Sequence, residues 1–202
     1  GIANHPALVE RMVAATKRYG TGSGASRLIS GTMPSHAELE ERIAIFKETQ
    51  AALLFNSGYA ANTGVLQGLF GPDDMIFSDA LNHASIIDGI RLTKAARRIY
   101  KHVDLADLEA ALKETQDYRT RLIVTDGVFS MDGNIAPLPE IVELAEKYDA
   151  AVMVDDAHAV GDRRHADRRR SHLRHPGHAA LRRSHSPDPP PHGAALHGGH
   201  RH

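Results

Sequence analysis

The stretch VMVDDAHAVG, residues 152–161, decides the fold, because a short apolar run ends there in two acids and a histidine. Other short apolar runs are AALLF (51–55), MIFS (75–78) and RLIVTDG (121–127). Helical patterns lie between and after these runs, near residues 59–69, 83–95, 104–116 and 137–148. Short apolar strands alternating with helices predict an α/β fold with a mostly parallel sheet and helices on both faces.

The first fifty residues read as helices. In NHPALVERMVAATKRYG, Asn4 is a candidate N-cap and Gly20 follows the last turn. In SHAELEERIAIFKE, Ser35 and Glu38 stand at capping-box spacing. The glycine-rich segment between them, residues 19–27, is interpreted as a flexible connection rather than a phosphate loop, because no strand precedes it.

Composition bounds the class of protein. The 202 residues are 42% hydrophobic and include no cysteine, which excludes a disulfide framework and a thiolate metal site. No run approaches the roughly 20 apolar residues of a membrane span. We therefore expect a cytoplasmic protein with no membrane partner, and the first residue, Gly1, suggests that a preceding segment is missing.

The last 41 residues differ from the rest. Residues 162–202 hold nine Arg and three Asp, a charge of +6, so residues 1–161 carry −7 of the net −1. Only Leu173, Leu181 and Leu196 are large and aliphatic there, too few to offset the entropy of ordering the segment. We predict a partial catalytic domain over 1–161 and a disordered tail over 162–202, with a frameshift in a GC-rich gene as the hypothesis for its composition.

Four stretches before residue 161 carry candidate chemistry. FNSGYAAN (55–62) suits a phosphate at a helix start, and SDALNHASIIDG (78–89) places His83 just after a strand. TDGVFSMDG (125–133) contains Ser130. The opening stretch pairs Asp155 with His158 at a strand end, where open α/β sheets bind ligands. Residue types and spacing leave open a metal site, an acid–base pair or a carboxylate partner for a heteroaromatic nitrogen.

These motifs, with GTGSGASRLISGT and HAELEERIAIFK, occur in an order that resembles the α-oxoamine synthases. Members of that family are pyridoxal 5'-phosphate (PLP) enzymes of the aspartate-aminotransferase fold, fold type I. The resemblance covers about residues 1–161. It implies that the chain forms part of the large domain of such an enzyme, with PLP as cofactor.

The resemblance also implies roles for individual residues. Ser57, Gly58 and Tyr59 match the turn whose amides hold the cofactor phosphate. His83 matches the imidazole that stacks on the pyridine ring, and Ser130 and His158 match groups near the ring's phenolic oxygen. Asp155 matches the carboxylate that keeps the pyridine nitrogen protonated. The catalytic candidates are therefore His83, Asp155 and His158.

The implied reaction joins an amino acid to an acyl-CoA. The run from residue 82 to residue 150 looks most like glycine C-acetyltransferase, which condenses glycine with acetyl-CoA in threonine degradation. The alternative is 8-amino-7-oxononanoate synthase, which uses alanine and a pimeloyl thioester in biotin synthesis. The resemblance implies a homodimer for the intact parent.

The sequence departs from the family at the lysine that anchors the cofactor. All six lysines precede Asp155 and none matches the family's lysine motif; they are Lys17, Lys47, Lys94, Lys101, Lys113 and Lys147. We therefore expect weak folding, little covalently bound cofactor and negligible catalysis from this polypeptide. An apolar sheet edge left open after residue 161 would favour aggregation.

A function of another class rests on the tail. His172, His175 and His178 belong to a segment with nine histidines, which could bind a metal ion, although Pro176 and Gly177 exclude a regular helix. Its arginines could contact nucleic-acid phosphates, but no aromatic side chain interleaves them to stack bases. We expect neither a built metal site nor a specific nucleic-acid partner.

Overall fold

The computed structural model describes residues 2–160. The chain divides into two compact units, residues 1–61 and residues 62–202. The predictions made for the tail, including disorder, the histidine cluster and phosphate contacts, lie outside the described residues.

The first unit contains three helices, α1 (Pro6–Tyr19), α2 (Arg27–Ser30) and α3 (Pro34–Lys47). Both α1 and α3 begin with proline, whose fixed φ suits the first helical position. The caps are consequently His5 and Met33, so the predicted caps at Asn4 and Ser35 are wrong by one and two residues. Gly20 ends α1 at φ 81°, in the region that favours glycine.

The segment AALLF, residues 51–55, is not a strand, and that prediction is wrong. A strand needs a neighbour that accepts and donates along its backbone, and within the described chain this segment has no ladder partner. Instead, the Leu54 amide donates to Glu40 Oε1 at 2.7 Å. The same carboxylate binds Arg27, and together these contacts lower the pKa of Glu40 to about 2.

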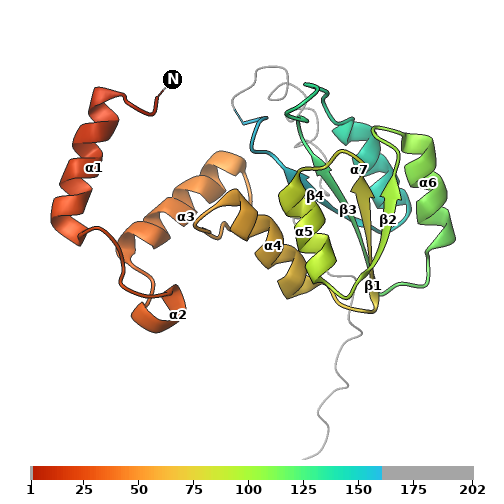
Figure 1. Ribbon diagram of the computed structural model, residues 1–202, viewed down its shortest axis with the longest axis horizontal. Helices are drawn as coiled ribbons and strands as arrows, with labels where there is room; N and C mark the ends of the chain where they lie inside the picture. Colours follow the sequence, from red (N-terminus) through yellow and green to blue (C-terminus); the bar gives the residue numbers. More distant parts are fainter. Residues whose placement is uncertain (1, 161–202) are drawn as a thin grey trace, which may run out of the picture. The chain divides into compact units, whose positions relative to one another are not determined.

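The second unit is built on a parallel sheet in the order β2-β1-β3-β4 (Figure 1). Its strands are β1 (Asp74–Asp79), β2 (Ala96–Tyr100), β3 (Thr120–Asp126) and β4 (Ala151–Asp155). Its helices are α5 (Ala84–Leu92), α6 (Leu105–Glu114) and α7 (Leu138–Lys147), with α4 (Gly58–Leu69) crossing from the first unit into the second. The predicted α/β fold with a parallel sheet is confirmed.

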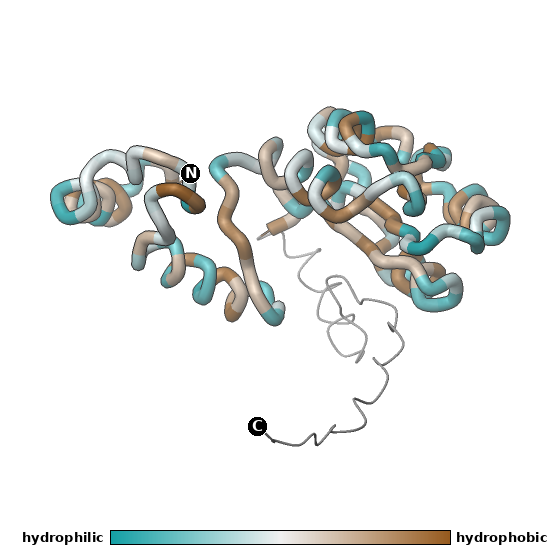
Figure 2. Tube along the Cα trace, turned by 90° about the horizontal axis from the view of Figure 1, so that it is seen from below, coloured by the Kyte–Doolittle hydropathy of each residue, from teal (hydrophilic) through white to brown (hydrophobic). Residues whose placement is uncertain are grey.

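Helices cover both faces of the sheet, because alternate strand residues point to opposite sides. On one face, Ile76 and Val124 pack with Leu66 of α4 and Ile86 of α5. On the other, residues from β1 and β3 pack with α6 and α7; these include Phe77, Ile123, Leu108, Leu112 and Ile141. Figure 2 shows the hydrophobic colour concentrated along the strands between the helices.

Strand β2 was not predicted; its sequence, ARRIY, follows the helix predicted near 83–95 and was assigned to no element. Arg97, Arg98 and Ile99 are exposed at the edge of the sheet, so the strand lacks an apolar run. Charged edge strands are a common protection against pairing with other chains.

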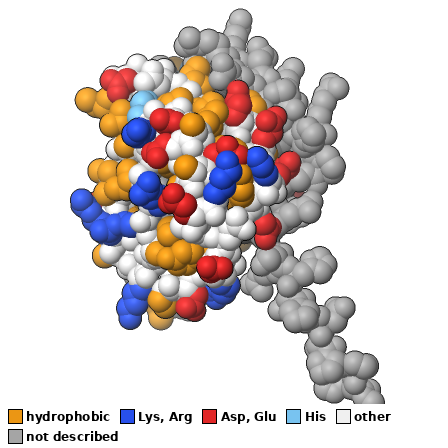
Figure 3. Space-filling view, turned by 90° about the vertical axis from the view of Figure 1, so that its right-hand side faces the viewer, with side chains coloured by type: hydrophobic (Ala, Val, Ile, Leu, Met, Phe, Trp, Pro, Cys, Tyr) orange, Lys and Arg blue, Asp and Glu red, His pale blue; other side chains and the backbone are white. Residues whose placement is uncertain are grey.

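The face that carries α6 mixes acidic and basic side chains, as Figure 3 shows, and Glu109 there binds both Lys113 and Lys147.

The strand order places a topological switch at β1 and β3. From β1 the chain passes outward to β2, and then returns to the other side of β1 to form β3 and β4. Ligands in open α/β sheets bind at the carboxyl ends of the strands beside such a switch.

Among the helices of residues 2–160, none has the length and hydrophobicity of a membrane span.

Candidate cofactor site

Three predicted site residues follow the carboxyl ends of three neighbouring strands. His83 lies four residues after β1 ends, Ser130 four residues after β3 ends, and Asp155 is the last residue of β4. Asp155 pairs in register with Asp126 of β3. Because the strands are parallel, all three residues follow or occupy the carboxyl ends of the strands, and their roles toward a cofactor stay predictions.

His83 is the N-cap of α5. Its Nδ1 accepts a hydrogen bond from the Ser85 amide at 3.2 Å and lies 2.7 Å from Ser85 Oγ. These contacts satisfy an amide that the first helical turn leaves without a partner, and they fix the ring orientation. Since the residue is exposed, its side chain is accessible to a ligand.

A buried amide connects His83 with Asp155. The Asn62 side chain donates to Asp155 Oδ2 at 2.7 Å and to Ser85 Oγ at 2.9 Å. Asn62 is 6% exposed and Ser85 1%, so the bond between them is buried, whereas the bond from Asn62 to Asp155 is partly buried. The second carboxylate oxygen of Asp155 accepts from the Ala157 amide at 3.1 Å. We call Asp155, Asn62, Ser85 and His83 the relay.

A second carboxylate, Asp126, lies beside the relay. Its Oδ2 accepts from the His83 amide at 3.0 Å, and its own amide donates to Asn82 Oδ1 at 3.0 Å. Burial and the negative charge of Asp155 raise the pKa of Asp126 to about 6. A carboxyl group whose pKa is shifted by burial and a neighbouring charge is typical of functional sites.

Ser130 and His158 lie in turns after β3 and β4, and both are exposed. Neither side chain belongs to the relay. Their predicted proximity to a ring oxygen stays a prediction. Within residues 2–160, no group of three or more His, Cys, Asp or Glu side chains could hold a metal ion, so Asp155 and His158 gain no third ligand there.

The predicted phosphate turn begins α4 in the first unit. Ser57 Oγ accepts from the Ala60 amide at 3.1 Å, which caps the first turn. Gly58 starts the helix, and a Cβ built on it would meet no described atom within 4 Å. Ser57, Gly58 and Tyr59 are exposed, so the start of the helix is accessible to an anion.

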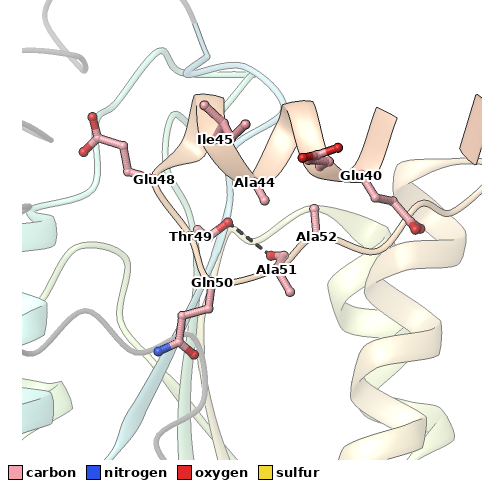
Figure 4. Close-up of a pocket in the computed structure, with 9 residues that line it drawn as sticks. Glu40, Ala44, Ile45, Glu48, Thr49, Gln50, Ala51 and Ala52 are labelled. Carbon is pink, nitrogen blue, oxygen red and sulfur yellow. Dashed lines mark hydrogen bonds between the residues drawn. The ribbon is translucent and has the colours of Figure 1, made fainter. Parts of the chain in front are cut away.

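The first unit also contains a groove beside the end of α3, shown in Figure 4, with a volume of about 450 Å³. Three carboxylates line it, those of Glu40, Glu41 and Glu48. None of the predicted cofactor residues contributes to it. A phosphate would be repelled by that charge, so this groove is not the cofactor site.

Sequence reasoning missed Asn62, Ser85 and the role of Asp126. Asn62 closes the quoted stretch FNSGYAAN, and Ser85 stands at the second helical position after His83, where a cap accepts. The capping rule could have found Ser85. Nothing in the sequence pairs Asn62 with Asp155, because 93 residues separate them.

Comparison with known proteins identifies the class. A profile of the family described as aminotransferase class I and II matches residues 2–183, and the chain belongs to that family. Within that class, the curated and solved relatives described below are α-oxoamine synthases, the group that the motifs of this chain resemble.

Two curated relatives are named 8-amino-7-oxononanoate synthase. The protein of Exiguobacterium sibiricum is 70% identical over 161 residues, which are 80% of this chain and 41% of the relative. The 8-amino-7-oxononanoate synthase 1 of Bacillus subtilis is 60% identical over 161 residues, with the same shares. The chain thus spans about 41% of the length of these relatives.

A solved serine palmitoyltransferase from S. paucimobilis, with PLP and myriocin bound, superposes with a TM-score of 0.74 and is 35% identical. The match covers 76% of this chain and 39% of that one. PLP is the cofactor of the family. The side chains at the carboxyl ends of the strands fit PLP. A carboxylate can accept a hydrogen bond from a protonated ring nitrogen, and an exposed imidazole can stack on a ring face.

Proposed function

We propose that the relay in the second unit is the part of a PLP site that holds the pyridine ring. The observation that carries this proposal is the hydrogen-bonded link from Asp155 through Asn62 and Ser85 to His83. It fixes a carboxylate and an imidazole at the carboxyl edge of the sheet before any ligand arrives. Preorganised partners bind more tightly because less freedom is lost on binding.

Each residue has a distinct task in this proposal. Asp155 accepts a hydrogen bond from the protonated ring nitrogen and thereby keeps the proton on that nitrogen. His83 lies against the ring face, and Asn62 keeps both partners in place. Bound PLP supplies the electron sink that makes the α-carbon of an amino acid reactive.

Ser130 and His158 are proposed to donate hydrogen bonds near the phenolic oxygen, and Ser57, Gly58 and Tyr59 to bind the phosphate. Exposure of all five is compatible with these roles. Asp126 is proposed to set the position of the His83 backbone through the hydrogen bond to its amide.

For the whole protein we propose the 8-amino-7-oxononanoate synthase reaction, in which alanine and a pimeloyl thioester condense with loss of carbon dioxide and the free thiol. The two curated relatives carry that name at 60% and 70% identity. These names favour 8-amino-7-oxononanoate synthase over glycine C-acetyltransferase, which the run from residue 82 to residue 150 resembles most. The homodimer and the cytoplasmic location stay predictions.

The choice between these activities is tested with a chimera. Residues 2–160 replace the corresponding segment of the Bacillus subtilis relative, and product formation is measured with alanine plus pimeloyl-CoA and with glycine plus acetyl-CoA. We expect turnover of the first pair to exceed that of the second at least tenfold. Preference for glycine and acetyl-CoA would overturn the proposal. The unsubstituted relative is the control.

A further inference from the structure

A second network lies at the same edge of the sheet and uses residues that no role above requires. It joins Asp79 at the end of β1, His102 after β2 and Asn134 before α7. We propose that His102 is a positioning residue that holds the loop carrying Ser130 in a fixed place relative to the segment carrying His83. This inference rests on the proposed PLP site.

Asp79 is the fixed end of the network. It is 2% exposed, and its carboxylate accepts from the Leu81 amide at 2.9 Å and the Val103 amide at 2.9 Å. The first bond orients the segment that leads to His83. The second holds Val103 at φ 55°, a left-handed conformation that is costly for a β-branched residue. A turn maintained at such a cost fixes the position of the preceding His102.

His102 uses both ring nitrogens. Its Nδ1 lies 2.9 Å from Asp79 Oδ1, and its Nε2 lies 3.0 Å from Asn134 Nδ2. A carboxylate accepts and an amide nitrogen donates, so Nδ1 faces an acceptor and Nε2 faces a donor. The ring also meets Phe129 edge-on, with centroids 4.5 Å apart. His102 therefore contacts the loop 127–136 twice.

Hydrogen bonds within the loop 127–136 hold its shape, so that a contact from His102 can position the loop as a whole. The Phe129 amide donates to the Asn134 carbonyl at 2.9 Å, and the Gly133 amide donates to the Phe129 carbonyl at 2.8 Å. Val128 and Ile135 also form an isolated antiparallel bridge. Because these backbone hydrogen bonds fix the shape of the turn that contains Ser130, the contacts of His102 with Asn134 and Phe129 determine where the turn, and with it Ser130, lies.

The test measures amide hydrogen exchange of the 202-residue chain without cofactor. The variants are His102→Asn, which keeps a donor toward Asp79 and loses the acceptor for Asn134, Asn134→Ala, and the double variant. Lys101→Ala is the matched control, because Lys101 is the exposed neighbour in the same turn. We expect exchange of amides 128–135 to rise about tenfold, the order expected when one hydrogen bond is lost.

The pattern across variants separates positioning from a general structural role. We expect His102→Asn to raise exchange of the loop at least as much as Asn134→Ala, because it also removes the contact with Phe129. We expect the double variant to equal His102→Asn, with unchanged exchange in β1 and β3. Additive effects of the two substitutions, or equal acceleration in the strands, would overturn the inference. So would an effect of Lys101→Ala as large as that of His102→Asn.

A cofactor titration provides the second readout. We expect His102→Asn to weaken reversible PLP binding about threefold to tenfold, because one partner of the ring is displaced. Binding of unchanged affinity together with a loosened loop would contradict a positioning role toward PLP. If the unsubstituted chain binds no PLP, the proposed PLP site fails, whereas hydrogen exchange still decides whether His102 anchors the loop.

Discussion

Asn62 Nδ2 lies 2.7 Å from Asp155 Oδ2 and donates its other hydrogen to Ser85 Oγ. One buried amide thereby joins α4, β4 and α5 at the edge of the sheet where ligands are expected. Hydrogen bonds to a charged group are stronger than those between neutral groups. The geometry of the candidate site therefore depends on a residue that need not touch the cofactor.

Removing that amide should impair both binding and stability. For Asn62→Ala we expect about tenfold weaker PLP binding and a loss of roughly 2 kcal/mol in the free energy of unfolding, since Asp155 and Ser85 both lose a partner. Fluorescence titration and urea denaturation measure the two effects. The control is Gln67→Ala, on the exposed side of the same helix. Equal behaviour of the two variants would contradict the role of Asn62.

Close packing of α4 against α5 depends on Gly89. A Cβ there would lie 2.8 Å from Leu66 Cδ1 and 3.2 Å from the Asn62 carbonyl oxygen. We expect Gly89→Ala to cost about 1–3 kcal/mol, the range for overpacking, as measured by urea denaturation. Gly68→Ala is the matched control, because no described atom lies within 4 Å of its added Cβ. A neutral Gly89→Ala would show that the helices separate without cost.

The amino ends of β1 and β3 are held by an ion pair. Arg119 donates to both oxygens of Asp74, at 3.0 and 2.7 Å, and Asp74 is fully buried. We expect Arg119→Ala to destabilise the chain at neutral pH, because a buried carboxylate is left without its cation.

The same pair has a pH signature. Burial opposes ionisation, but the bonds from Arg119 and the Gly71 amide outweigh it and lower the pKa of Asp74. A lowered folded pKa gives stability above the unfolded value, which is lost as pH falls through the folded one. The difference between Arg119→Ala and the unsubstituted chain should therefore shrink in acid. A difference in the free energy of unfolding that is as large in acid as at neutral pH would contradict the pairing.

Asp126 should give the opposite pH dependence. Its pKa is about 6 in the folded chain, above the unfolded value of about 3.9. The folded state then holds its proton more tightly, so this contribution to stability is complete below pH ~4 and is lost as pH rises through 6. For Asp126→Asn, which retains an acceptor for the His83 amide, we expect greater relative stability above pH ~6.

Urea denaturation from pH ~4 to ~8 compares Asp126→Asn with the unsubstituted chain. Subtraction removes the contributions of other titrating groups. A difference that does not change between those limits would show that Asp126 ionises as freely in the folded chain as in the unfolded one.

The local sequence predicted a strand correctly where one run of apolar residues forms one buried strand. Three strands, β1, β3 and β4, are such runs, and their ends located His83, Ser130 and Asp155. The edge strand β2 was missed because its arginines are exposed. Residues 51–55 were wrongly predicted as a strand, because apolar sequence does not reveal whether a neighbouring strand exists to pair with it.

The connections within the site were not predictable from sequence. Asn62 and Asp155 meet only because of how α4 and β4 pack, and His102 meets Asn134 at a sequence separation of 32. Such contacts follow from the topology of the sheet. The raised pKa of Asp126 likewise arises from its burial and from the charge of Asp155, which lies in register with it.

The most direct test of the PLP site is a titration of the 202-residue chain with PLP, followed by visible circular dichroism, for the unsubstituted chain and Asp155→Ala. A ring held in a chiral site gives an induced signal, whereas PLP attached to an exposed lysine gives little. We predict a saturable signal that Asp155→Ala abolishes or weakens at least tenfold. A signal of equal affinity in Asp155→Ala, or no signal in the unsubstituted chain, would contradict the proposed role of the relay.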